Sequence, residues 1–253
     1  MDGAVILLSK QIDQVLMKET ILILSCEHAS NHLPHDWQYL FHGPTLSSDL
    51  NDDFKCFDPY AKELSIYLAK NLHCDLRLGG ISRLLLDLNK SEEQEHCFSA
   101  DIIEKISEQE KKSLLECYYY PFRQDFSDLV KKHIQENQQV LHLSIHTFNP
   151  VEKGKRLNTA IGLLYDPKRH AEKEVARIFH EILIKRTPYK VRLNYPRAGK
   201  SDNHTSSIRK NLDETCYLGI ELECNALLLH DKEQATLLYE NLLVSIQSLL
   251  ELL

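Results

Sequence analysis

The sequence predicts an α/β protein of three layers, with helices on both faces of a mostly parallel β-sheet. Short apolar runs typical of buried strands alternate with longer segments of helical periodicity, and this alternation usually produces a parallel sheet. The 253 residues contain no internal repeat, low-complexity tract or Gly/Ser linker. We therefore expect one domain over residues 1–253.

Short apolar runs bounded by polar residues are the expected strands. They are Ile21–Cys26, Arg83–Leu88, Val140–Ile145, Ala160–Tyr165, Tyr189–Leu193 and Leu218–Leu222. In parallel sheets of this kind, ligands bind at the carboxyl ends of the strands. Residues that carry chemistry should therefore follow these runs.

Segments with apolar residues at helical spacing lie between most of the strands. The first starts at Asp58-Pro59, where an Asp cap followed by Pro is a typical helix start, and continues through Ala61, Leu64, Leu68 and Leu72. The other expected helices are Ala100–Leu115, Pro121–Glu136, Lys168–Ile184 and Lys232–Leu252.

Charge and composition exclude several partners. A net charge of −7 gives no long-range attraction to nucleic acid or to an anionic membrane. No apolar run reaches the roughly 18 residues that span a bilayer. The apolar stretch Ala4–Leu8 follows Asp2 rather than a cationic region and precedes no small-residue cleavage site, so we expect no signal peptide. The seven cysteines form no CxxC pair, which favours free thiols and a cytoplasmic protein.

Polar residues do follow the predicted strands. His28 comes just after Ile21–Cys26, His146 directly after Ile145, and Glu221 and Glu223 lie at the end of the last strand. Zinc in hydrolases prefers three N/O ligands and an open position for water. Each signal alone is also typical of a hydrogen-bonded surface residue, and with 13 histidines some follow strands by chance.

Several segments, in order, resemble those of the N-formylglutamate amidohydrolases over roughly residues 20 to 250. They are Ser25–Asn31, Asp58–Ala61, Ser82–Lys90, Tyr119–Arg123, His146–Pro150, Ile161–Asp166, Asn194–Asp202 and Ile220–Leu222. That family in turn resembles zinc carboxypeptidases and succinylglutamate desuccinylases. The resemblance implies a mixed, carboxypeptidase-like sheet between helices and one catalytic Zn²⁺.

The resemblance also implies roles for individual residues. His28 and His146 become metal ligands, with Asp58 as the third; Glu27 and Asn31 are the alternatives, because a helix cap also explains Asp58. Glu221 becomes the carboxylate that activates the attacking water, with Glu223 as its rival. The expected substrate-binding residues are Arg83, Asn89, Lys90, Arg197 and Arg209, although each cation is equally typical of a structural ion pair. Asp87 and Asp202 would orient their neighbours.

Some positions depart from the family pattern. Lys90 stands where Arg is usual, and Lys offers a point charge instead of two parallel hydrogen bonds. Tyr60 stands where Gly is usual, and Glu223 where Arg is more frequent. These departures bear on the substrate more than on the chemistry.

Three functions remain open at this point. The first is a zinc-dependent hydrolase of N-acyl amides of acidic amino acids such as N-formyl-L-glutamate, with a small anionic substrate. The second keeps the zinc and acts on short or cell-wall peptides. The third is a degenerate family member that binds a small acidic ligand without turnover.

Overall fold

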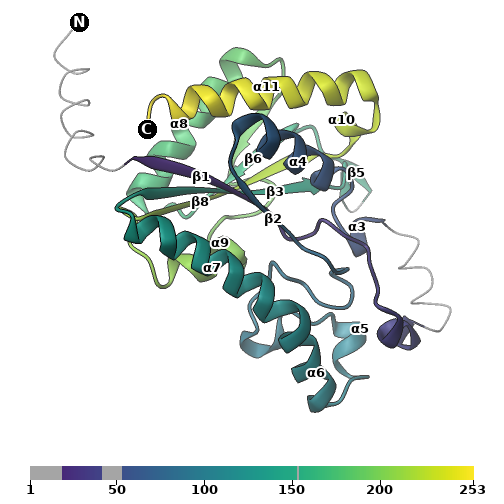
Figure 1. Cartoon of the computed structure of the whole chain (residues 1–253). Helices are drawn as coiled ribbons and strands as arrows, with labels where there is room; N and C mark the ends of the chain where they lie inside the picture. Colours follow the sequence, from purple (N-terminus) through teal and green to yellow (C-terminus); the bar gives the residue numbers. More distant parts are fainter. Residues whose placement is uncertain (1–18, 42–52, 153) are drawn as a thin grey trace, which may run out of the picture.

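The computed structural model describes residues 19–41, 53–152 and 154–253. A six-stranded sheet forms its centre, between helices (Figure 1). Its strands are β1 (Thr20–Cys26), β2 (Asp75–Leu78), β3 (Gln139–Phe148), β6 (Ile161–Leu164), β7 (Val191–Leu193) and β8 (Tyr217–Asn225). The strand order is β2-β1-β3-β8-β6-β7. Strands β2, β1, β3 and β8 are parallel, whereas β6 runs antiparallel to β8 and β7 parallel to β6. The mostly parallel, mixed sheet is thus confirmed.

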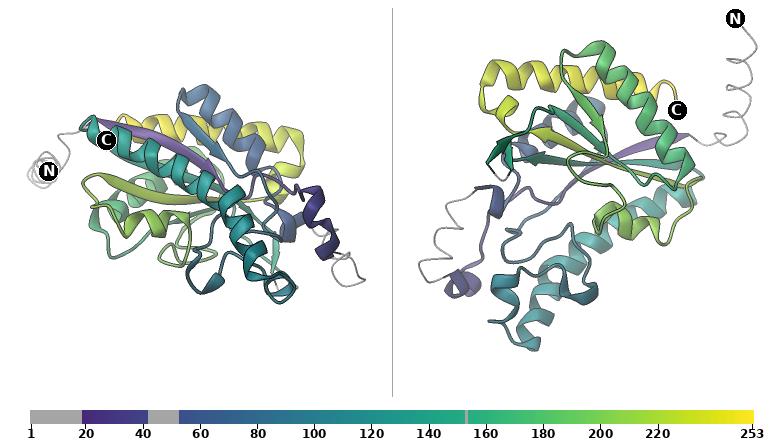
Figure 2. Two further views of the ribbon diagram at one scale, coloured as in Figure 1. Left: turned by 60° about the horizontal axis from the view of Figure 1, so that its bottom comes forward. Right: turned by 180° about the vertical axis from the view of Figure 1, so that it is seen from behind.

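Helices cover both faces of this sheet (Figures 1 and 2). One face carries α4 (Ala61–Leu72), α8 (His170–Arg186), α10 (Leu227–His230) and α11 (Lys232–Leu250). The other carries α7 (Tyr120–Gln135) and α9 (His204–Arg209). Alternate residues of β1 serve the two faces: Leu22 and Leu24 pack with α4 and α11, while Ile23 packs with Phe126 of α7. The three-layer architecture is confirmed.

The expected helices match the observed ones to within a few residues, with one exception. The segment Ala100–Leu115 is broken into α5 (Ala100–Ile103) and α6 (Glu108–Leu114). Ser107 starts α6 with a reciprocal capping box to Glu110, a local signal that outweighs the continuous apolar pattern. A π-helical stretch, η3 (Leu115–Tyr119), then joins α6 to α7.

The predicted strand Arg83–Leu88 is wrong. This segment consists of turns and irregular backbone, and its four leucines are buried in a second apolar cluster with Cys97, Ile102 and Leu114, away from the sheet. Three short elements contribute to this cluster, namely η1 (His35–Phe41), α3 (Asp53–Cys56) and α5, and η2 (Glu93–Glu95) shortly precedes its member Cys97. A segment that is buried outside a sheet can have the same run of apolar residues as a buried strand. The apolar pattern alone therefore could not distinguish the two.

Strand β2 was not predicted, since its residues are only half buried at the sheet edge and carry a weak apolar pattern. The short hairpin of β4 (Val151–Glu152) and β5 (Lys155–Arg156) was also missed. The seven cysteines are free, as expected. No described helix is long and apolar enough to cross a membrane. The stretch Ala4–Leu8 lies outside the described residues.

The start of α4 differs from the predicted Asp cap. Tyr60 occupies the N-cap with a left-handed φ of 69° and no side-chain cap. A side chain at positive φ is uncommon, and the Tyr60 hydroxyl forms a hydrogen bond of 2.9 Å with His230 Nδ1. Asp58 contributes only its carbonyl to this turn, accepting from the Ala61 N–H. Its carboxylate is therefore free to face the carboxyl edge of the sheet.

Candidate metal centre

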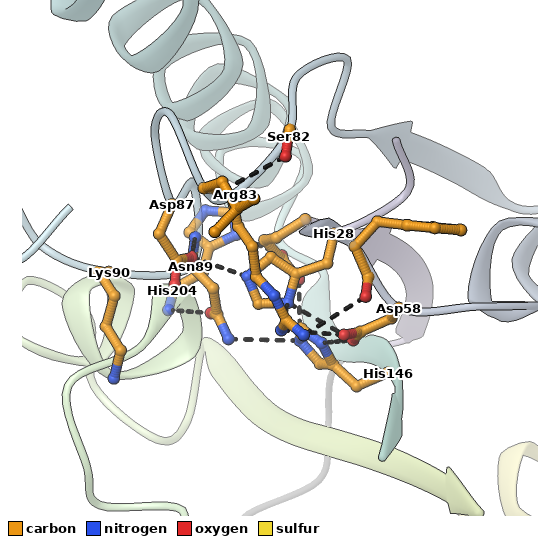
Figure 3. Close-up of polar contacts among 12 residues, drawn as sticks. His28, Asp58, Ser82, Arg83, Asp87, Asn89, Lys90, His146 and His204 are labelled. Atoms are coloured by element: carbon orange, nitrogen blue, oxygen red, sulfur yellow. Dashed lines mark hydrogen bonds and ion pairs between the residues drawn. The ribbon is translucent and has the colours of Figure 1, made fainter. Parts of the chain in front are cut away.

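Three buried side chains meet at the carboxyl ends of β1 and β3. His28 follows β1, His146 lies near the end of the adjacent parallel strand β3, and Asp58 precedes α4. One ligand atom from each lies within 4.8 Å of the other two (Figure 3). All three residues are at most 5% exposed. The pattern on the two strands thus brings the two predicted histidines together with the predicted aspartate.

The spacing of these atoms fits a tetrahedral zinc ion. Zinc bonds of about 2.0–2.2 Å place neighbouring ligand atoms about 3.4 Å apart. Asp58 Oδ2 lies 3.4 Å from His28 Nδ1 and 2.7 Å from His146 Nδ1. The second distance is that of a hydrogen bond, which a metal ion would replace with two coordination bonds. Two imidazole nitrogens and one carboxylate oxygen are a donor set typical of catalytic zinc.

Each histidine has a carboxylate behind it. His28 Nε2 lies 2.7 Å from Asp87 Oδ1, and His146 Nε2 lies 3.1 Å from Glu27 Oε2. Both rings therefore turn Nδ1 toward Asp58. Such outer carboxylates fix the ring orientation and the tautomer of metal-binding histidines.

The charges of this cluster shift the pKa values of its members. For Asp87, burial favours the neutral acid, but the charge and hydrogen bond of His28 outweigh burial and lower the pKa to about 2. For Asp58, burial is likewise outweighed, by Arg83 and then His28, and its pKa falls well below the usual range. For His146, burial opposes protonation, yet hydrogen bonds to Asp58 and Glu27 raise its pKa well above the usual value. Without a metal, His146 is thus a cation between two carboxylates.

The alternative third ligands lie elsewhere. Glu27 is fully buried and contacts Nε2 of His146, the nitrogen that faces away from Asp58. Asn31 is exposed and lies outside the pocket around the histidines. Among the three predicted candidates for the third ligand, only Asp58 has a carboxylate oxygen close to Nδ1 of both histidines.

Arg83 forms part of the wall beside these atoms. Its Nη1 lies 3.0 Å from Asp58 Oδ1 and 3.1 Å from His28 Nδ1, where it uses the lone pair that a metal would take. Its other donors bond to the backbone carbonyls of Lys55, Phe54 and Phe57. The guanidinium is thus anchored by the chain and presents one edge to the site.

Glu221 and Glu223 of β8 face the same pocket. In the β3–β8 register, Glu221 pairs with Ser144 and Glu223 with His146. Glu221 Oε1 accepts a hydrogen bond of 3.3 Å from Asn89 Nδ2, whereas the carboxyl group of Glu223 makes none with the described residues. Burial, reinforced by Asp58 and Glu221, raises the pKa of Glu223 to about 7 despite nearby His146 and Arg197. Two carboxyl groups with different environments on one strand are suited to proton transfer.

The pocket itself has a volume of about 160 Å³. Nine of the predicted site residues line it: His28, Asp58, Arg83, Asn89, Lys90, His146, Arg197, Glu221 and Glu223. Lys90 donates to the carbonyl of Asp202 at 2.8 Å, and its ammonium has no carboxylate partner among the described residues. Arg197 is exposed and forms no hydrogen bond or ion pair with the described part of the chain. Two cations in this wall are therefore available to an anionic molecule.

Two predicted substrate-binding residues have other contacts. Arg209 lies outside this pocket and is 8% exposed. Its three nitrogens donate to Glu172 Oε1 and to the carbonyls of Gly199 and Gly219, at 2.6–2.9 Å. Arg209 is thus a structural residue in this fold, a correction to its predicted role. Asn89 lines the pocket, but its amide spans Glu221 and the backbone N–H of His204.

Sequence reasoning did not single out His142 or His204. Both are buried beside Glu27, and the three side chains form a second group with metal-ligand spacing. The signal was present in β3, since His142, Ser144 and His146 alternate along the strand and share one face. His204 carries no comparable pattern, because it starts the short helix α9 far along the chain.

This fold and this cluster together define an α/β protein with a buried His–Asp–His centre at the carboxyl edge of its parallel strands. The model of the N-formylglutamate amidohydrolase family matches residues 20–228. The chain therefore belongs to the N-formylglutamate amidohydrolase family, which makes it a member of a family of hydrolases.

Solved structures share the fold. A gene product of Agrobacterium tumefaciens superposes with a TM-score of 0.72 at 22% identity, covering 90% of each chain. The N-formylglutamate amidohydrolase of Ralstonia eutropha superposes with a TM-score of 0.71 at 14% identity, covering 93% of this chain and 94% of the other. At these identities the likeness is one of fold. No curated protein sequence matches the chain.

Proposed function

We propose that the chain is a zinc-dependent amidohydrolase that cleaves the N-acyl amide of an acidic amino acid, N-formyl-L-glutamate or a near relative. The observation that carries this proposal is the meeting of His28 Nδ1, Asp58 Oδ2 and His146 Nδ1 beside the carboxylates of β8. Family membership supports the amide as the bond that is cleaved.

His28, Asp58 and His146 would hold the zinc ion. When bound, the ion supplies a Lewis acid that polarises the amide carbonyl and makes water a stronger acid near neutral pH. Three protein ligands would leave room at the ion for a water molecule. Asp87 and Glu27 keep the two imidazoles oriented from behind.

We assign the proton transfer to Glu221, whose orientation Asn89 fixes through a hydrogen bond. Glu221 accepts the proton of the attacking water and delivers it to the nitrogen of the leaving amine. Glu223 is the second candidate for this role, because a carboxyl group with a pKa of about 7 exchanges protons readily at neutral pH. Comparing Glu221→Gln with Glu223→Gln tests the assignment, and we expect the larger loss of kcat in the former.

Cations of the pocket would bind the carboxylates of the substrate. Lys90 and Arg197 are the two that lack a carboxylate hydrogen-bond partner among the described residues, and they suit an acidic amino acid. Arg83 Nη1 is next to the ligand atoms, and we assign it to the amide carbonyl oxygen. Anion recognition by these local charges is compatible with the net charge of −7.

Metal content and hydrolysis test this function together. Zinc-loaded protein should bind about one equivalent and release amine from N-formyl-L-glutamate faster than from N-formyl-L-leucine or a short peptide. His28→Ala, Asp58→Ala and His146→Ala should each lose the metal, whereas His35→Ala, whose side chain is 95% exposed, should keep it. Faster cleavage of the peptide would favour a peptidase. Bound zinc without hydrolysis of any of these compounds would favour a ligand-binding protein.

A further inference from the structure

Behind the candidate metal centre lies a fully buried carboxylate, Glu27, which accepts hydrogen bonds from four side chains. Its Oε1 accepts from Ser25 Oγ at 2.5 Å and from His204 Nδ1 at 2.7 Å. Its Oε2 accepts from Ser144 Oγ at 2.6 Å and from His146 Nε2 at 3.1 Å. A carboxylate offers about four lone-pair sites, so these four donors occupy all of them.

This arrangement keeps a proton on Nε2 of His146. Because the carboxylate only accepts, the imidazole must donate from Nε2. Ser144 Oγ also lies 2.9 Å from Nε2, but its hydrogen is directed to Glu27, so its oxygen can accept from the Nε2–H. Asn89 Nδ2 is the most distant neighbour of Nε2, at 3.4 Å, and donates to Glu221 at 3.3 Å. In the metal-free structure Asp58 Oδ2 accepts from Nδ1 at 2.7 Å in the same way, so both nitrogens carry a proton. If a metal ion took the place of the Nδ1 proton, the remaining proton would stay on Nε2 beside Glu27.

From this geometry we propose that Glu27 is a positioning residue for the metal centre, which fixes His146 in the tautomer that can bind metal through Nδ1. We further propose that His204 acts through Glu27 by holding its other oxygen. The inference rests on the zinc site of the proposed function. It concerns residues to which the family resemblance gave no such role.

His204 is itself held firmly. Its ring lies between those of Phe122 and Phe126, with centroids 5.4 and 4.7 Å away, and its backbone N–H donates to Asn89 Oδ1 at 2.7 Å. Since Asn89 also donates to Glu221, the same residue connects the start of α9 to the pocket. His204 therefore brings a rigid N–H donor to Glu27 from a helix far along the chain.

The spacing of Glu27, His142 and His204 would also suit a second metal ion, but Glu27 and His142 have no free lone pair, and His204 turns its Nδ1–H toward Glu27. Both nitrogens of His142 have partners at 2.6 Å, Ser25 Oγ and the Tyr217 hydroxyl. Glu27 has no unoccupied lone pair, as described above. The cluster is therefore better explained as a hydrogen-bonded support than as a second metal site.

Replacing Glu27 by glutamine should weaken this support. An amide has one accepting oxygen and one donating NH₂ group, so one of its two sides must place N–H groups against existing donors. If the NH₂ group faces Ser144 and His146, the Ser144 hydroxyl can no longer donate to residue 27 and turns toward Nε2 of His146. This favours the tautomer with its proton on Nδ1. In that tautomer Nδ1 has no lone pair with which to bind a metal. Loss of such outer partners usually weakens metal binding 10- to 100-fold.

The test measures zinc affinity by competition with a chromogenic chelator, together with the visible spectrum of the Co²⁺-loaded protein. We expect Glu27→Gln to raise the zinc Kd about 10- to 100-fold and to alter the cobalt spectrum. His204→Phe should raise the Kd less, and His204→Asn should restore it, because the asparagine NH₂ occupies the place of Nδ1–H. The matched control is Glu172→Gln, a change in another fully buried carboxylate, which bonds to Arg209 and the Gly219 N–H away from the metal centre. It should destabilise the fold without changing the zinc Kd.

A second measurement needs no variant. Long-range ¹H–¹⁵N correlation spectra of zinc-loaded wild-type protein should show His146 protonated at Nε2 and coordinated through Nδ1. An Nδ1–H tautomer, an unchanged zinc Kd in Glu27→Gln, or an equal loss in Glu172→Gln would overturn the positioning role while leaving the zinc enzyme intact. A wild-type protein that binds no zinc would overturn both this inference and the proposed function.

Discussion

Asp87 Oδ1 lies 2.7 Å from Nε2 of His28, on the opposite side of the imidazole from the nitrogen that faces Asp58. Glu27 stands in the same relation to His146. The two histidines come from neighbouring parallel strands, yet their carboxylates come from a turn-rich loop and from the end of β1. The orientation of each imidazole is thus fixed by a carboxylate from a different segment of the chain: Asp87 for His28 and Glu27 for His146.

Substituting Asp87→Asn should lower zinc affinity about 10- to 100-fold, because the neutral amide no longer supports the imidazole with a negative charge. With a pKa of about 2, Asp87 is ionised throughout the range in which the protein can be assayed, so the loss should not vary with pH above about 4. Chelator competition at pH 6 and pH 8 measures it. Asp125→Asn, which removes an exposed partner of Arg77, is the control and should leave the affinity unchanged. Equal affinities for both variants would refute the supporting role.

Zinc binding should release at least one proton at neutral pH, since the pKa of His28 is raised as well, with burial outweighed by the charges of Asp87 and Asp58. The pKa of His146 in the metal-free protein lies well above its usual value, since burial is outweighed by hydrogen bonds to Asp58 and Glu27. The ring is therefore doubly protonated before zinc arrives, and coordination through Nδ1 must displace a proton. Calorimetric titrations at pH 7 in two buffers of different ionisation enthalpy measure this number. Identical apparent enthalpies in both buffers would contradict the prediction.

Periodicity and cap signals were sufficient to predict the layers of the fold. The helices α4, α8 and α11 carry long apolar stripes, which few other arrangements could bury. The segment Arg83–Leu88 was wrongly predicted as a strand because its four leucines suggested burial in a sheet. They are instead buried against α5 and α6. Local apolarity reports burial, whereas strand pairing depends on partners far along the chain.

The candidate site was predictable to a similar degree. His28 and His146 follow strands, so their meeting at one edge could be inferred from topology. Asp58 could be placed only by resemblance, because its position before a proline is also explained by a helix cap. Arg209 was assigned to the substrate because a lone arginine in a sequence does not reveal Glu172, its partner 37 residues away. Glu27 and His204 are 177 residues apart, and no local pattern connects them.

Glu223→Gln should flatten the pH dependence of stability in the metal-free protein. Burial raises the folded-state pKa of Glu223 from 4.5 to about 7, so the folded protein keeps a proton that the unfolded chain loses near pH 4.5. Stability from this group is complete below pH 4.5 and is lost as the pH rises to about 7. The loss is at most about 3.5 kcal/mol, from about 1.4 kcal/mol per pKa unit over the shift from 4.5 to about 7.

The neutral glutamine avoids this loss. The variant should match the wild-type protein at pH 4.5 and unfold at higher urea concentration at pH 8, both in the presence of chelator. Urea titrations at pH 4.5, 6 and 8 measure the difference, and Glu63→Gln on the surface of α4 is the control. If the difference between variant and wild type did not change with pH, the raised pKa would be disproved.

Gly79→Ala should disturb the metal centre from the far side of β1. Gly79 directly follows β2, and its N–H donates to the carbonyl of Cys26 at 2.8 Å. A Cβ at this position would lie 1.9 Å from the carbonyl oxygen of Glu27, far inside van der Waals contact, so the backbone that carries Glu27 and His28 must move. A backbone shift in a packed core typically costs about 1–3 kcal/mol, and it should also weaken zinc binding because both histidines depend on this segment.

Gly80→Ala is the matched control, since a Cβ there meets no atom within 4 Å. Urea unfolding and chelator competition on both variants check the prediction, which fails if Gly79→Ala and Gly80→Ala behave alike.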